Sequence, residues 1–259
     1  MNQEKRILVC EDSMEGIFSA VYDGWKECAG GCKVSIQTSF PVSMELFTSY
    51  REIATDQSKA GKVMRTILMR LGSEVYEQIC LAAASADEDR GTAIYYVLHR
   101  AFWGGRCEKR VMEALADPYV SRVAKLALCV KREYHHYFGF VRFREIGGRF
   151  LLAKIQPGND ILSLMALHFS NRFPNENWVI YDEKRQKALC HEKGKECVMR
   201  KGVRIQVPGS AVGDMGEYEE LWQTFCDSIS IEARRNEKLQ KQMLALHFRS
   251  NMPEFSVKG

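Results

Sequence analysis

The stretch that decides the fold covers residues 131–185 and reads KREYHHYFGFVRFREIGGRFLLAKIQPGNDILSLMALHFSNRFPNENWVIYDEKR. It opens as the last turns of a long amphipathic helix that carries two adjacent histidines. An aromatic strand, Tyr137–Arg144, is expected next, and Gly147 and Gly148 favour a two-residue hairpin turn. A second strand, Phe150–Gln156, follows the turn, and then come a short helix and a further strand. This order of elements predicts a sheet with mainly antiparallel pairing in the second half of the chain.

Upstream of this stretch the pattern is mostly helical. From residue 58 to residue 104, apolar residues recur every three or four positions, which is typical of helices that bury one face. Two short apolar runs, Ile7–Cys10 and Val34–Thr38, have the composition of strands. We therefore expect a helix-rich region with short strands before the central stretch.

The sequence predicts an α+β fold with two lobes. Residues 1–110 would form a helix-rich N-terminal lobe with short strands. Residues 111–259 would form an α+β lobe that contains the HHYFGFVRF hairpin and a mainly antiparallel sheet, with C-terminal helices packed on it. The helix expected at Tyr218–Ile229 and the basic segment Arg234–Arg249 supply these C-terminal elements. The two lobes could also form one continuous domain.

Composition is that of a soluble protein with a mildly basic balance. The chain has 259 residues, of which 46% are hydrophobic and 27% are charged, and its formal net charge is +4. No run approaches the ~18 apolar residues that a transmembrane helix needs. Residues 1–12 have no apolar core of a signal peptide. We expect a cytoplasmic location with no membrane partner, and the charge permits a polyanionic partner.

Nine cysteines raise the question of a metal site. Cys190, His191 and Cys197 could form part of a zinc site, but no second close pair accompanies them. Cys28 and Cys32 form a CxxxC that lacks the third cysteine of a radical-SAM cluster motif. In a reducing compartment, most cysteines act as small buried hydrophobes. We therefore expect no metal site and no cofactor.

A candidate nucleic-acid surface is the best-supported binding site in the sequence. On the expected strand, aromatic and arginine side chains alternate onto one face, where they could stack bases and contact phosphates. Two further arginines flank the strand that contains Trp178 and could extend this surface. The candidate residues are Phe138, Phe140, Arg142, Arg144, Arg172 and Arg185. The alternative is a core strand whose arginines pair with nearby carboxylates.

His135 is a candidate general acid or base, because an unperturbed histidine titrates near neutral pH. The alternative is that it interacts with the last carbonyls of its helix, whose C-terminal dipole favours a cation. No serine or cysteine has a sequence context that marks an activated nucleophile. The sequence leaves open whether the chain is itself catalytic.

Several segments resemble, in order along almost the whole chain, a bacterial family assigned to DNA metabolism or DNA repair and built on a domain of unknown function. In the central stretch, Arg132-Glu133-x-His135 precedes a GFVRF segment. Two of its usual residues differ here, at His136 and Glu237. The other matching segments are DSMEGIFSAVY (12–22), RTILMRLGSEVY (65–76), GTAIYYVL (91–98), RFPNENW (172–178), Leu221-Trp222 and IEARRNEKLQ (231–240).

The resemblance implies a partner and a setting. Members of that family accompany a radical-SAM protein that is assigned to DNA repair or modification, and some carry a fused uracil-DNA glycosylase domain. It implies an accessory protein that binds DNA or positions the substrate for the radical-SAM partner. Two alternatives stay open: an enzyme that acts on a nucleotide or DNA base through His135, and a scaffold that contacts only protein.

Overall fold

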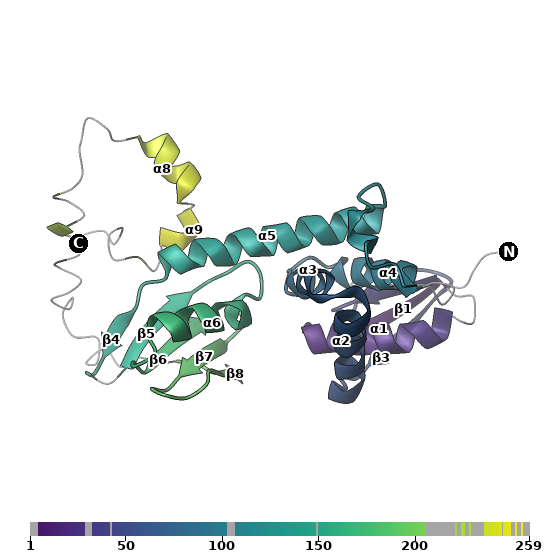
Figure 1. Ribbon diagram of the computed structural model, residues 1–259, viewed down its shortest axis with the longest axis horizontal. Coiled ribbons are helices and arrows are strands. Elements are labelled where there is room, and N and C mark those ends of the chain that lie inside the picture. The colour runs from purple at the N-terminus through teal and green to yellow at the C-terminus, as the bar shows by residue number, and fades with distance from the viewer. Residues whose placement is uncertain are drawn as a thin grey trace. The chain divides into compact units, whose positions relative to one another are not determined.

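The computed structural model divides into two compact units, Met1–Arg132 and Glu133–Gly259. The division falls within helix α5 (Pro118–Phe140), later than the boundary expected after residue 110 (Figure 1). The structure describes residues 5–28, 33–41, 43–102, 107–148, 150–205, 221, 224–225, 228, 236–244, 246–249, 252 and 255.

The first unit contains a three-stranded parallel sheet in the order β2-β1-β3. The central strand β1 (Lys5–Cys10) is buried from Ile7 onward, as the strands of covered parallel sheets are. Its neighbours are β2 (Lys33–Gln37) and β3 (Thr48–Ile53). β1 and β2 coincide with the apolar runs expected to form strands, whereas β3 was not expected because TSYREI has no apolar run.

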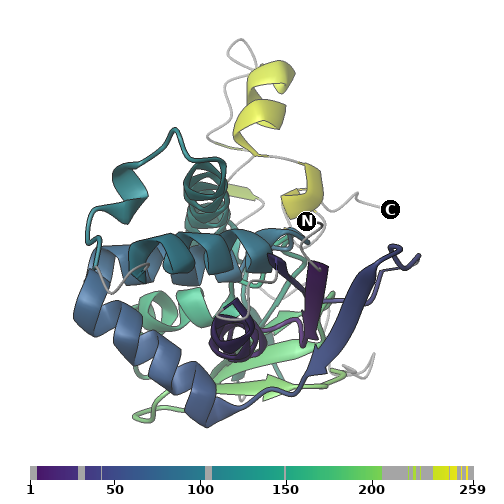
Figure 2. The same ribbon diagram turned by 90° about the vertical axis from the view of Figure 1, so that its right-hand side faces the viewer.

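Four α-helices and one short 3-10 helix complete the described part of this unit before α5. They are α1 (Met14–Cys28), α2 (Gln57–Leu71), α3 (Ser73–Ala83), α4 (Arg90–Phe102) and η2 (Val111–Glu113). Both α1, seen almost end-on in Figure 2, and α4 pack against the sheet. A Cβ at Gly91 would lie 2.8 Å from a methyl carbon of Ile36, so α4 approaches β2 closely. The predicted helical stripes form the core, where Ile67, Ile79 and Ile94 are buried.

The second unit contains a five-stranded sheet in the order β4-β5-β6-β7-β8. The pairs β4–β5, β6–β7 and β7–β8 are antiparallel, whereas β5 and β6 are parallel and are joined by helix α6 (Leu162–Arg172). This confirms the α+β fold class and the mainly antiparallel sheet. The strands are β4 (Arg144–Ile146), β5 (Phe150–Ile155), β6 (Trp178–Asp182), β7 (Lys187–His191) and β8 (Val198–Lys201).

The predicted strand Tyr137–Arg144 is wrong. Helix α5 continues to Phe140, and the strand begins only at Arg144. Aromatic residues four positions apart hold the last helical turns, since the rings of Tyr134 and Phe138 lie 5.3 Å apart. Phe138, Phe140, Arg142 and Arg144 therefore do not share a strand face.

The hairpin after this helix is present, with a different register. Gly147 and Gly148 adopt φ of 59° and 64°, the left-handed conformation that glycine tolerates best. Ile146 pairs with Phe150, so the connection has three residues instead of the expected two. As a result, Arg144 pairs with Leu152.

A buried aromatic cluster lies between α6 and the sheet. Trp178 is fully buried, and its ring lies 6.2 Å from that of Phe169 and 6.3 Å from that of Phe143. Trp222 lies outside the described residues, as does most of the helix expected at Tyr218–Ile229.

The described C-terminal helices are α8 (Glu237–Met243) and α9 (Leu246–Arg249). Phe248 of α9 packs against Tyr137 of α5, with ring centroids 4.8 Å apart. None of the described helices is both long and apolar enough to cross a membrane.

Candidate functional site

A line of cationic and aromatic side chains joins the end of α5 to α6. The ring of His135 lies 5.6 Å from that of Phe138, which stacks on His168 at 3.9 Å and an interplanar angle of 10°. Arg172 follows His168 by four residues on α6, so the two side chains lie on the same side of that helix. The last turns of α5 and the C-terminal part of α6 thus present one row of groups.

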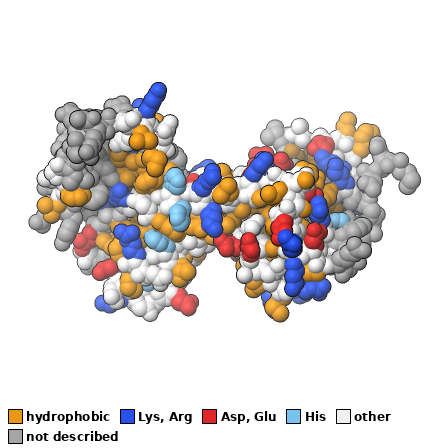
Figure 3. Space-filling view, turned by 45° about the horizontal axis from the view of Figure 1, so that its top comes forward, with side chains coloured by type: hydrophobic (Ala, Val, Ile, Leu, Met, Phe, Trp, Pro, Cys, Tyr) orange, Lys and Arg blue, Asp and Glu red, His pale blue; other side chains and the backbone are white. Residues whose placement is uncertain are grey.

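Arg172 is exposed and extends this row towards β4. Its guanidinium lies 5.5 Å from the centre of the Phe173 ring, in the range of a cation–π contact. The Phe173 ring lies 5.4 Å from that of Phe143, and Arg144, also exposed, comes next in the chain. We name His135, His168, Arg172 and Arg144 the cationic surface. Figure 3 shows histidine side chains gathered near lysines and arginines on one face of the second unit.

The exposed guanidinium of Arg172 supplies positive charge on this surface, whereas the surroundings of His168 favour its neutral form. Partial burial lowers the pKa of His168 below its ordinary value, and the positive charges of Arg172 and His135 lower it further. Its Nε2 atom is buried and has no hydrogen-bond partner among the described residues. An approaching phosphate would raise the pKa again, because a nearby negative charge stabilises the imidazolium.

Three of the predicted nucleic-acid residues are engaged within the protein. Arg142 donates to the carbonyl oxygens of Gly139 and Val141, at 2.7 and 3.3 Å, and so satisfies carbonyls at the end of α5. Phe138 is half-buried and stacked on His168, and Phe140 packs 5.1 Å from the ring of Phe248. Each of these two rings therefore already has an aromatic partner within the protein.

Arg185, also predicted to bind nucleic acid, forms an internal network. Its Nη1 donates to the carbonyl oxygen of Pro157 at 3.0 Å and to Oδ2 of Asp182 at 3.1 Å, and its Nη2 donates to the carbonyl of Gly158. The side chain of Asp182 is fully buried. Arg185 therefore neutralises a buried carboxylate and fixes a loop.

Glu133 of α5 holds the same loop from its other side. Its carboxylate accepts hydrogen bonds from the backbone N–H groups of Gly158 and Asn159, at 2.6 and 3.0 Å. It also accepts one from the side-chain amide of Asn159, at 2.6 Å. We name residues 156–160 the braced loop, because Glu133 and Arg185 both anchor it.

An open cavity of about 560 Å³ lies at the braced loop. It sits at the carboxyl ends of the parallel strands β5 and β6, where open α/β sheets commonly bind ligands. Its charged lining residues are Glu133, Glu183 and Lys184. With two carboxylates against one ammonium group, this cavity is poorly suited to a phosphate.

The contacts of His135 give no support for acid–base catalysis. Its ring is exposed and contacts the rings of Tyr134 and Phe138. Within the part of the chain that the structure describes, it makes no hydrogen bond to a carboxylate or a hydroxyl group. His135 therefore lacks the orienting partner that a general base ordinarily has.

The cysteines and the histidine considered for zinc have other environments. His191 is buried, stacks on Trp178 at 5.0 Å, and has its Nδ1 2.9 Å from the carbonyl oxygen of Glu176. Burial raises the pKa of both the Cys190 and Cys197 thiols, which disfavours the thiolate that binds metals. Among the described residues, no group of three or more His, Cys, Asp or Glu side chains could hold a metal ion. Cys32 of the CxxxC lies outside those residues.

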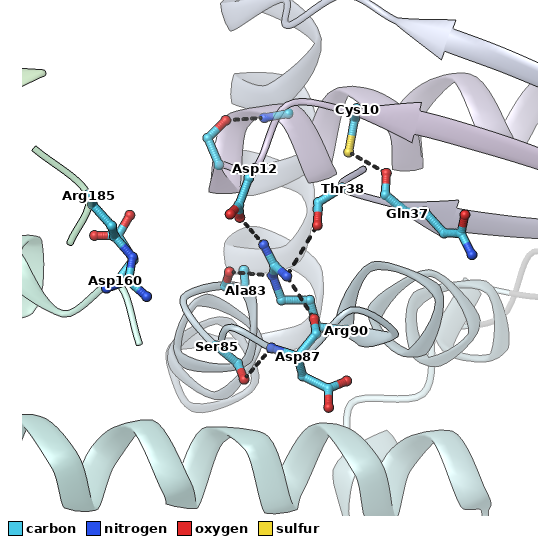
Figure 4. A network of polar contacts seen from close by, with 12 residues as sticks. Cys10, Asp12, Gln37, Thr38, Ala83, Ser85, Asp87, Arg90, Asp160 and Arg185 are labelled. Carbon is cyan, nitrogen blue, oxygen red and sulfur yellow. Dashed lines mark hydrogen bonds and ion pairs between the residues drawn. The ribbon is translucent and has the colours of Figure 1, made fainter. Parts of the chain in front are cut away.

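In the first unit, a buried polar network centres on Arg90 (Figure 4). Its guanidinium donates to the carbonyl oxygens of Ala83 and Asp87, at 3.2 and 2.7 Å, and to the hydroxyl of Thr38 at 3.4 Å. It also pairs with Asp12. Burial raises the pKa of the neighbouring Cys10 to about 12. Arg90 is thus engaged on all sides and ties α4 to the loop after β1.

His168 is the residue of the cationic surface that was not among the candidates predicted from the sequence, whereas His135 was predicted for a different role. His168 lies on α6 beside the buried Met165 and Phe169, at the spacing of an apolar helical stripe, so the pattern does not mark it as a surface residue. The signal that could have found it is the four-residue spacing to Arg172, which places two potential cations on one helix side.

Comparison with known proteins assigns the chain to a family. A family model described as a domain of unknown function, DUF4130, matches residues 88–254, which is well over half of the chain. This match includes α4, α5 and the cationic surface. Neither the curated proteins nor the solved structures gave a match to the chain. The chain therefore belongs to the family defined by the domain of unknown function DUF4130.

Proposed function

We propose that the protein is an accessory protein of DNA repair or modification, which binds the phosphate backbone of DNA through its cationic surface. The observation that carries the proposal is the continuous row His135, Phe138, His168 and Arg172, built from two helices. In this proposal, bound DNA is positioned for a radical-SAM partner.

The arrangement favours phosphate contact over base stacking. Phe138 already stacks on His168, whereas the guanidinium of Arg172 is exposed. Arginine and protonated histidine both donate charge-assisted hydrogen bonds to phosphate oxygens. Such contacts fix the position of a protein on DNA without reading its sequence. We therefore expect binding that depends strongly on salt and weakly on base sequence.

The DNA-repair setting and the radical-SAM partner rest on the sequence resemblance. Co-purification from the native host, with both proteins expressed, tests the partner directly. Recovery of a radical-SAM protein would support the accessory role. Its repeated absence under gentle conditions would argue against a radical-SAM partner and would not affect the proposed DNA binding.

The surface itself is tested by a double substitution, Arg144→Ala with Arg172→Ala. Binding to a fluorescently labelled oligonucleotide is measured by anisotropy over a series of salt concentrations. Each lost phosphate contact lowers the slope of log affinity against log salt by about one unit, so a decrease of about two units is expected.

Arg200→Ala provides the matched control. Arg200 is an exposed arginine on β8, at the opposite edge of the same sheet from β4. Its removal should leave the salt slope unchanged. Equal slopes for the wild-type protein, the control and the double variant would exclude the cationic surface as the binding site.

A further inference from the structure

The first unit contains a cavity of about 340 Å³ between α1, α2 and α4. Its walls are almost entirely apolar and include the rings of Tyr22, Trp25 and Phe102. Trp25 is 37% exposed although it is a large aromatic residue, and its ring lies 5.8 Å from that of Phe102. Exposed aromatic side chains that line a hollow are typical of ligand sites.

Two lysines lie at this cavity. The ammonium groups of Lys26 and Lys62 lie 5.2 and 5.7 Å from the centre of the Tyr22 ring. Neither forms an ion pair with a carboxylate among the residues that the structure describes. By contrast, the neighbouring Lys59 is paired with both carboxylate oxygens of Asp23, at 2.9 and 2.8 Å.

Helix α2 strengthens the positive potential at the cavity. It carries four basic residues and no acidic residue along its length. Because no carboxylate of that helix offsets these charges, a bound anion would gain from the field of α2 as well as from direct contact with Lys62.

The interior of the cavity suits an apolar ring better than a nucleobase, which has a polar edge. The hydroxyl of Thr66 already donates to the carbonyl oxygen of Lys62 at 2.7 Å. The polar groups of the lining side chains are the hydroxyls of Thr66 and Tyr22, the indole N–H of Trp25 and the two lysine ammonium groups; the remaining lining side chains are hydrocarbon. A nucleobase would leave most of its polar edge without partners, which is costly when that edge is buried.

We infer that this cavity binds a small molecule that has an apolar ring and an anionic group. The ring would lie against Tyr22, Trp25 and Phe102, and the anionic group would meet Lys26 and Lys62. This inference concerns the first unit and does not depend on the proposed DNA binding by the second.

The test uses two probes of nearly identical shape. Anilinonaphthalene sulfonate carries an anionic group, and N-phenylnaphthylamine is its neutral counterpart without the sulfonate. Fluorescence titration of the full chain measures the affinity of each probe. The sulfonate should bind at least about fivefold more tightly, since each exposed ion pair adds a modest factor. The double substitution Lys26→Met with Lys62→Met should remove this preference while the neutral probe still binds.

Two further variants locate the site. Thr66→Trp places a large ring across the cavity from an exposed position and should abolish the binding of both probes. Lys125→Met removes an exposed lysine on α5 that does not line the cavity, and should leave both affinities unchanged. Circular dichroism confirms that each variant is folded. Equal affinity for the two probes in the wild-type protein, no binding of either, or unchanged binding in Thr66→Trp would each overturn the inference.

Discussion

The braced loop and the cationic surface use the same residue types for opposite purposes. At the braced loop, Arg185 donates to two carbonyl oxygens and to the fully buried Asp182. On the cationic surface, Arg172 is exposed and contacts an aromatic ring, and His168 keeps a buried nitrogen without a partner among the described residues. Arg185 and Asp182 neutralise each other within the fold, whereas the exposed guanidinium of Arg172 could be neutralised by an external anion.

This contrast shows that an arginine's role depends on the acceptors that the fold brings to it. Arg172 and Arg185 both flank the strand of Trp178, and no sequence pattern distinguishes them. Arg185 stabilises the braced loop because the fold brings it within hydrogen-bonding distance of Pro157 and Gly158. The comparison can be tested by changing one region and measuring stability and DNA binding together.

The largest expected effect on stability is that of Arg185→Ala. It leaves the buried carboxylate of Asp182 without its cation, which typically costs about 3–5 kcal/mol. We expect a value near the lower end, because the backbone N–H groups of Lys184 and Arg185 also donate to Asp182. Urea denaturation measures the loss, and Lys184→Ala, an exposed neighbour, is the control. If Arg185→Ala kept full stability but bound DNA poorly, Arg185 would have a role in DNA binding and not in the stability of the braced loop.

Glu133→Ala should have the next largest effect. It removes the acceptor of three hydrogen bonds from Gly158 and Asn159 and should lower the free energy of unfolding by about 1–3 kcal/mol. The exposed Glu192, which pairs with Lys195, supplies the control variant Glu192→Ala. An equal, small loss in both variants would show that the loop does not depend on Glu133.

A smaller effect is expected from pH, through His168. Its folded-state pKa is lowered, so the unfolded state takes up a proton first and stability should fall as the pH decreases through about 6.5. DNA binding should change in the opposite sense, because phosphates raise the pKa of the imidazole and protons are taken up on binding.

Two histidine substitutions check the origin of this pH dependence. His168→Gln should flatten the dependence of DNA affinity on pH. His136→Gln should not, because His136 contacts Phe140 and Phe248 and lies outside the cationic surface. Affinity that does not rise on acidification of the wild-type protein would contradict the proposed role of His168.

Much of the fold could be predicted from local patterns. The apolar stripes of α2, α3 and α4 and the glycine pair of the β4–β5 hairpin follow from spacing and turn chemistry. The end of α5 could not be predicted in this way, because the sequence of residues 137–143 suits both an aromatic strand and a helix. Contacts of Tyr137 with Phe248 of α9, more than a hundred residues away, lie beyond such local patterns.

The candidate site was predictable only in part. Arg144 and Arg172 are exposed. Arg142 and Arg185 donate to carbonyl oxygens that no sequence pattern indicates. His168 was missed because its spacing fits the buried face of α6, and only its stacking on Phe138 places it beside His135. Loop geometry and contacts between helices therefore determine which of the candidate residues belong to the surface, and neither can be predicted from local sequence patterns.

The most direct test of the central claim compares Arg172→Ala with Arg185→Ala in one set of salt titrations and denaturation curves. For Arg172→Ala, we predict a salt slope lower by about one unit and a change in stability within about 0.5 kcal/mol. For Arg185→Ala, we predict an unchanged slope and a clear loss of stability. An unchanged slope for Arg172→Ala, with DNA affinity equal to that of the wild-type protein, would contradict the assignment of nucleic-acid binding to the cationic surface.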